Sequence, residues 1–292
     1  MPGYEPLISF QNQLEGHTLD RITFVCFGAS YLTALGLYSA SQVSRLAWLR
    51  GVAIFFHAAG GLAQSMYLAY HQPALFSPNG FFLCFSWLIA IVTLQMGISS
   101  RARSVNLFSL PVVLVLVALA WFQGGAGQEG AILLRDARGW GLFHALALVI
   151  ASLSMGFGAV AACMYLVRAR QLRNKHRPGT GVELPSLEKL EGKVRQSVVV
   201  AFPLLTIGVL IGGGMLLSDA AQLGGFSDPR VLGTLVLWVD FAVLVWLRYG
   251  MKVRGRSLAV LVIFAFALLL VCAALPHSLP AKWHVPSTGA AP

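Results

Sequence analysis

Three ionisable side chains stand inside long apolar stretches of the sequence: His57, His144 and Asp240. In a segment that crosses a membrane, such a group is costly unless it pairs with another group, binds a cofactor or carries protons. No second carboxylate and no basic residue accompanies Asp240 within these stretches. We therefore favour a hydrogen bond from a neighbouring helix over proton relay or cation binding for Asp240. The two histidines are the candidates for ligand chemistry.

His144 stands near the start of its apolar stretch, ahead of a row of small side chains. Ala147, Ala151, Ser154 and Gly158 follow it at helical spacing and share one face. Such a row lets a second helix pack closely. A histidine above a smooth surface is also the arrangement found on haem-binding membrane helices. The residues alone leave both interpretations open.

His57 precedes the small residues Ala58–Gly61. They would leave room beside the imidazole for a flat ligand. They would equally let helices approach, with the ring hydrogen-bonded to a neighbouring carbonyl or hydroxyl group. We favour this second, structural interpretation for His57 and keep the ligand role as its alternative.

The composition indicates that these residues are positioned by membrane helices. Of the 292 residues, 57% are hydrophobic and only 11% are charged, and the mean hydropathy is +0.73. About 20 apolar residues cross a bilayer as a helix. The sequence therefore predicts one all-α transmembrane domain over residues 1–292, with about eight helices. The apolar stretches lie at about 22–41, 51–70, 80–98, 107–122, 141–167, 197–217, 231–247 and 257–275.

The basic residues predict the orientation of the bundle. Sixteen of the 21 Lys and Arg residues lie in the loops after the first, third, fifth and seventh stretches, which the positive-inside rule assigns to the cytoplasm. Both termini are then outside, with an outer segment at 1–20, a cytoplasmic loop at 168–196 and an outer tail at 276–292. The same distribution explains the net charge of +10 by contact with lipid headgroups, so no nucleic-acid partner is expected.

This orientation separates the histidines by depth. Four further histidines lie at or near the outer surface: His17, His71, His277 and His284. At ~1.5 Å per residue, His57 and His144 differ in depth by roughly 15 Å, which is too far for one metal ion. His277 directly follows the last stretch and lies at a depth similar to that of His144. Two imidazoles from different helices can hold a haem iron, so His144 and His277 are the predicted pair, with His71 as the substitute.

Motifs of soluble enzymes are missing from the sequence. It has no phosphate-binding glycine loop with a lysine, no nucleophile elbow and no zinc-protease motif. The four cysteines fall in apolar stretches without metal-binding spacing. Gly208 and Gly212 form a GxxxG pair, which favours close helix contact. We expect no catalytic residues and no enzyme activity.

Several short motifs follow one another in order between about residues 140 and 275. They are the histidine-headed stretch with its basic exit at 143–175, Leu184–Leu190, Phe202–Gly208 and Arg254–Arg256. In this order they resemble the cytochrome c assembly family of the CcsA/HemX type. The family carries a tryptophan-rich segment on the outer side, but here the corresponding 223–230 keeps only its Asp228-Pro229-Arg230 end. This difference favours the shorter HemX-like branch.

The resemblance implies a protein of the bacterial inner membrane that handles haem in cytochrome c assembly. It implies that haem b is held near the outer face with His144 and His277 on the iron, beside the 226–230 loop and its Asp228. His57, which matches a histidine of HemX-like members, would make a second, deeper contact. Membrane lipid, haem and other cytochrome c assembly or respiratory-complex proteins are the expected partners. The alternative is a cofactor-free scaffold or complex subunit that recruits partners through the basic loop.

Overall fold

The computed structural model describes residues 5–44, 46–71, 73, 77–98, 104–123, 139–174, 184–218, 228–253 and 255–275, without the side chains of 5–23, 43, 47 and 218. Over these residues the regular structure is helical throughout. The helices are α1 (Glu5–Ser44), α2 (Ala47–His71), α3 (Pro78–Ile98), α4 (Val105–Phe122), α6 (Gly139–Arg173), α7 (Leu187–Ser218), α8 (Pro229–Tyr249) and α9 (Arg256–Ala274).

The prediction of a polytopic helical bundle is confirmed. Eight helices of the described chain are long and apolar enough to cross a membrane, with mean hydropathies from 1.3 to 2.9. Each apolar stretch of the sequence corresponds to one of them. The protein is therefore a multi-pass membrane protein.

Three helices extend beyond the predicted boundaries. α1 begins at Glu5, so most of the predicted outer segment at 1–20 is helical. The predicted loop at 168–196 is helical at both ends, because α6 continues to Arg173 and α7 begins at Leu187. Hydropathy identifies membrane crossings, whereas leucine, glutamate, lysine and arginine continue a helix into water. Much of the loop predicted at 168–196 is therefore helical.

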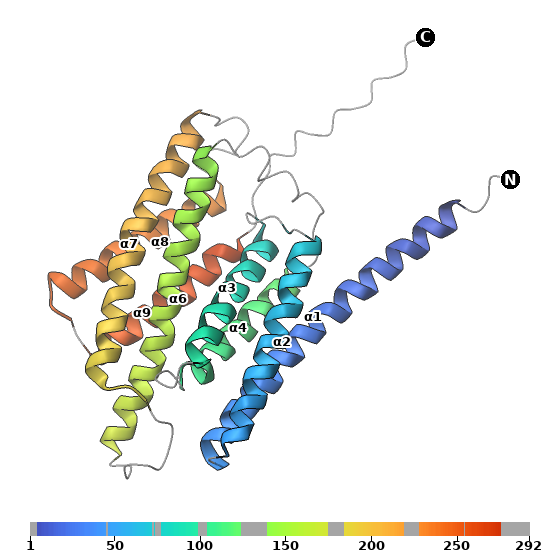
Figure 1. Ribbon diagram of the computed structural model, residues 1–292. Helices are drawn as coiled ribbons and strands as arrows, with labels where there is room; N and C mark the ends of the chain where they lie inside the picture. Colours follow the sequence, from blue (N-terminus) through green and yellow to red (C-terminus); the bar gives the residue numbers. More distant parts are fainter. Residues whose placement is uncertain are drawn as a thin grey trace.

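The helices form two groups that follow the chain order. α1–α4 make up one group and α6–α9 the other, and Figure 1 shows α6 and α7 side by side along their length. The groups meet where α3 and α4 pack on α6 and α9. There the ring of Phe85 lies 6.3 Å from that of Phe266. A Cβ atom on Gly156 would lie 3.2 Å from the Phe85 ring, so glycine allows this close contact.

A buried hydrogen-bond network links α1, α2 and α3 inside the first group. The Tyr31 hydroxyl donates to Oε1 of Gln64 at 2.8 Å. Nε2 of Gln64 donates to Oγ of Ser86 at 2.8 Å and to the Leu83 carbonyl at 3.1 Å. Water cannot replace these partners in the hydrocarbon core. The network therefore fixes how the three helices are aligned along their axes.

Replacement of Gln64 by leucine should destabilise this group. The change removes all three bonds and leaves the Tyr31 hydroxyl buried without its acceptor, so we expect a loss of about 1–2 kcal/mol. Unfolding of the purified protein by a denaturing detergent, followed by circular dichroism, measures it. Gln95→Leu, the same change at an exposed position of α3, is the control. Equal losses in the two variants would contradict the role given to the network.

Candidate functional site at the start of α6 and the end of α7

His144 lies in the second turn of α6 and contacts α7. Its Nδ1 is 2.7 Å from the backbone carbonyl oxygen of Gly208. Because a carbonyl oxygen can only accept, Nδ1 must carry the proton and donate it. In the neutral ring, Nε2 then holds the lone pair that can bind a metal ion. The backbone of α7 thus fixes the tautomer and the orientation of the imidazole.

The two glycines of the GxxxG pair make this contact possible. A Cβ atom on Gly212 would lie 2.7 Å from Cε1 and 3.6 Å from Nε2 of His144, and one on Gly208 would lie 2.7 Å from Leu148. Any side chain at either position would displace what packs there. The predicted close helix contact is present, and at Gly212 its partner is the histidine.

The small side chains below His144 pack against neighbouring helices. Ala147, Ala151 and Gly158 are buried, and a Cβ atom on Gly158 would clash with Ser197 of α7. Ser154 is half-buried. The helix-packing interpretation therefore accounts for the row below the histidine.

The end of α7, the start of α8 and the end of α9 lie toward the same end of the bundle as His144 (Figure 1). The Leu275 side chain lies so close to Gly233 of α8 that a Cβ atom on this glycine would be 2.9 Å from it. His277, two residues further on, lies outside the described residues. The structure therefore gives no His144–His277 distance, and the pair stays a prediction.

Asp228 is the N-cap of α8. Its Oδ1 accepts a hydrogen bond of 2.7 Å from the backbone N–H of Arg230, and Pro229 occupies the first turn. The side chain is 2% exposed. Asp228 thus determines where α8 begins, and its contact with the cofactor stays a prediction. Residues 226 and 227 of the predicted loop lie outside the described part.

His57 is enclosed within the other helix group. Its ring makes edge contacts with Tyr31 and Tyr38 of α1, at centroid distances of 5.8 and 6.3 Å. Neither ring nitrogen forms a hydrogen bond of ordinary geometry with the described residues, although the ring lies near the Ala90 carbonyl. A Cβ atom on Gly60 would lie 2.9 Å from Tyr31. Gly60 therefore makes room for this tyrosine, as the structural interpretation expects.

Asp240 and His71 complete the predicted candidates. Oδ2 of Asp240 is shielded from solvent and has no hydrogen-bond partner among the described residues, so the expected bond from a neighbouring helix is not found there. His71 ends α2 with its exposed ring 4.3 Å from that of Tyr67. The side chain of His17 and the whole of His284 lie outside the description. In the described part of the chain, no three His, Cys, Asp or Glu side chains gather as a metal site.

Two contacts that position the site were not predicted. One is the Gly208 carbonyl that orients His144. The other is the hydrogen bond of 3.0 Å from Nε1 of Trp238 to Oγ1 of Thr206, which holds α8 against α7. The GxxxG pair was the only sequence signal for the first contact, since it predicted that the α7 backbone is approachable. The second depends on how two helices are rotated, which periodicity does not specify.

The family model described as cytochrome C assembly protein matches residues 77–284, which include α3–α9 and His144. The chain belongs to this family. The match begins after α2, so His57 is not part of it.

Curated relatives agree with this assignment. A cytochrome c biogenesis protein CcsA of Guillardia theta is 23% identical over 64% of this chain and 67% of its own length. A CcsA of Microcystis aeruginosa is 24% identical over 66% of this chain and 72% of its own. A Prochlorococcus marinus CcsA is 28% identical, but over only 37% of this chain and about a third of its own length. No solved structure matches the chain.

Proposed function

We propose that this protein binds haem in cytochrome c assembly, with His144 and His277 as axial ligands near the outer face of the membrane. The observation that carries the proposal is the hydrogen bond from Nδ1 of His144 to the Gly208 carbonyl. Histidines that bind metal ions in proteins typically donate a hydrogen bond from their other ring nitrogen in this way. His144 is thus held as a neutral ligand with Nε2 available.

The residues at the outer end fit this ligand role. The absence of a side chain at Gly212 lets the His144 ring pack directly against α7, and Asp228 caps the start of α8. The bound haem would supply a six-coordinate iron that can change its oxidation state. The protein's part is to orient one imidazole through α7 and to provide the second from the tail after α9. His57 would make the deeper contact only if Tyr31 and Tyr38 moved away from it.

The remaining parts of the proposal follow from the family. We place the protein in a bacterial inner membrane, with noncovalently bound haem b and with other cytochrome c assembly or respiratory-complex proteins as partners. The names of the curated relatives support a role in cytochrome c assembly. The distribution of basic residues supports an orientation with both termini outside. The proposed role is accessory and not enzymatic.

Loss of the gene in its host should test this role. If the protein serves cytochrome c assembly, membranes of the deletion strain contain fewer proteins with covalently bound haem, as seen by haem staining of a denaturing gel. Wild-type protein restores them, whereas His144→Ala, produced at the same level, does not. Unchanged haem staining in the deletion strain would reject a role in assembly.

A cofactor-free scaffold is the second candidate, and the lengths of α6 and α7 favour it. They contain 35 and 32 residues, or about 50 Å each, against a hydrocarbon core of about 30 Å. Their predicted cytoplasmic ends therefore project beyond the core and expose Lys189, Lys193 and Arg195. If the scaffold role is right, replacing these residues by glutamine abolishes co-purification of a partner. The wild-type protein would then show no haem spectrum.

A further inference from the structure

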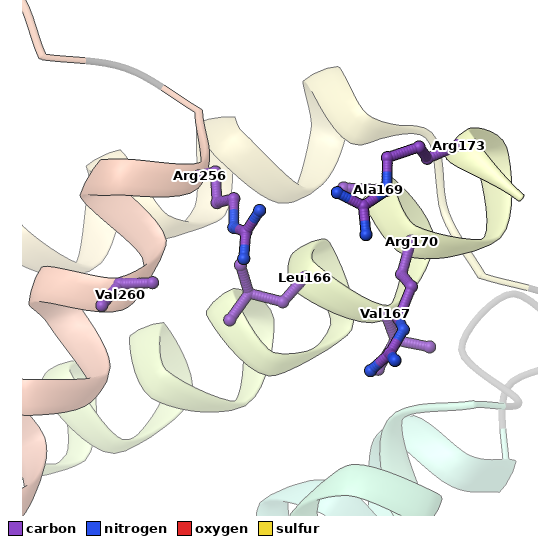
Figure 2. Close-up of a pocket in the computed structure, with 7 residues that line it drawn as sticks. All are labelled: Leu166, Val167, Ala169, Arg170, Arg173, Arg256 and Val260. Carbon is purple, nitrogen blue, oxygen red and sulfur yellow. The ribbon is translucent and has the colours of Figure 1, made fainter.

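A basic hollow lies at the opposite end of α6 from His144. It has a volume of about 530 Å³ and lies between the end of α6 and the start of α9. Three arginines line it, Arg170 and Arg173 from α6 and Arg256 from α9, together with the apolar side chains of Leu166, Val167 and Val260. Figure 2 shows Arg173 and Arg256 extending toward one another across the space between the two helices.

The positive charge of this hollow is not balanced by its lining. Among the described residues that line it, none is acidic, and Arg170, Arg173 and Arg256 are exposed. α9 also begins here at Gly255, which offers no side-chain cap to the first turn. The first N–H groups of a helix carry a partial positive charge and favour an anion. Three guanidinium groups around one space repel each other unless an anion lies between them.

The position of the hollow restricts which anion can reach it. Arg170 is 26 residues along α6 from His144, which corresponds to about 39 Å along the helix. His144 lies near the outer boundary of the hydrocarbon core, so Arg170 lies at or just beyond the headgroups of the other leaflet. The exposed side chains of Val167 and Val260 belong to the apolar surface of the spans. The hollow therefore offers basic side chains at the depth of the lipid phosphates, next to apolar side chains at the depth of the acyl chains.

We propose that this hollow binds an anionic phospholipid of the cytoplasmic leaflet. The planar guanidinium group binds phosphate oxygens in a bidentate manner, so the arginines would hold the phosphodiester. The acyl chains would lie on Leu166, Val167 and Val260. Basic hollows between membrane helices on this side are typical sites for such headgroups. The bound lipid would bridge α6 and α9. This lipid site is separate from the proposed haem site and does not depend on it.

Native mass spectrometry of the full-length protein in a neutral detergent tests this site. Phosphatidylglycerol is titrated and its retention compared with that of phosphatidylcholine carrying the same acyl chains. We expect the wild type to retain phosphatidylglycerol preferentially. In the double variant Arg173→Gln/Arg256→Gln, its apparent affinity should fall roughly ten- to thirtyfold, because each basic residue near the surface contributes about 1 kcal/mol.

The control variant is Lys189→Gln/Arg195→Gln, which removes the same charge from a second basic hollow near the start of α7. Its affinity should change less than twofold. Phosphatidylglycerol should also raise the melting temperature of the wild type and of this control, but not that of the Arg173/Arg256 variant. Equal loss of binding in both variants would overturn the proposal, as would equal retention of phosphatidylcholine. Displacement of the lipid by millimolar inorganic phosphate would assign the hollow to a free anion instead.

Discussion

His144→Ala should purify without bound haem from cells in which the wild-type protein retains it. The variant loses the nitrogen that the Gly208 carbonyl orients, and the second histidine alone cannot hold the iron in six-coordinate form. Loss of a group that merely orients a metal ligand weakens binding about 10–100-fold, so loss of the ligand itself should exceed this range. Haem content per protein, from extraction of the cofactor and amino-acid quantitation, measures the effect.

Two further variants identify the partner of His144. His277→Ala should lose haem as completely, whereas His71→Ala should keep it, because His71 packs against Tyr67 at the end of α2 in the other helix group. Exogenous imidazole added to His144→Gly should restore a haem spectrum, which would not occur if the residue only stabilised the fold. Full haem content in His144→Ala would contradict the site, and loss in His71→Ala with retention in His277→Ala would replace the predicted partner.

Gly212→Val should disturb the same site without replacing a ligand. The added Cβ would lie 2.7 Å from Cε1 of His144, so the imidazole must rotate away from the Gly208 carbonyl or the helices must separate. Because the hydrogen bond that fixes the tautomer is then lost, we expect haem affinity to fall about 10–100-fold. Titration of the purified apoprotein with haem measures it.

Gly213→Val is the matched control for Gly212→Val. It makes the same change one residue further along α7, where an added Cβ meets no atom within 4 Å. Both variants carry the same cost of placing a β-branched residue in a helix, so their difference reports the contact with His144. Equal haem affinities for the two variants would show that the contact between His144 and α7 has no part in haem binding.

The sequence predicted the spans well because membrane crossing depends on a few averaged properties. Runs of about 20 apolar residues and the distribution of basic residues identify spans and sides without knowledge of side-chain packing. α1, α6 and α7 extend beyond their predicted boundaries, because hydropathy no longer identifies a helix once it leaves the membrane. Polar residues such as Glu188 and Lys189 continue it by their helix propensity alone.

The candidate site was predictable only in part. The sequence predicted that His57 and His144 lie at different depths, which stays a prediction. The structure places these two residues in different helix groups. The rotation of each helix decides what an imidazole faces, and no periodic pattern specifies this rotation. Small residues therefore predicted room at both histidines. At Gly60 the room is taken by Tyr31, whereas at Gly212 it holds the His144 ring.

The absorption spectrum of the full-length wild-type protein, purified after haem supplementation of the culture, tests the central claim most directly. Two histidine ligands predict a Soret band with the sharp visible bands of a six-coordinate, low-spin haem b after reduction, and all haem should be extractable by acidified organic solvent. Absence of a Soret band in folded protein would contradict haem binding. A five-coordinate, high-spin spectrum would contradict the pair of His144 and His277.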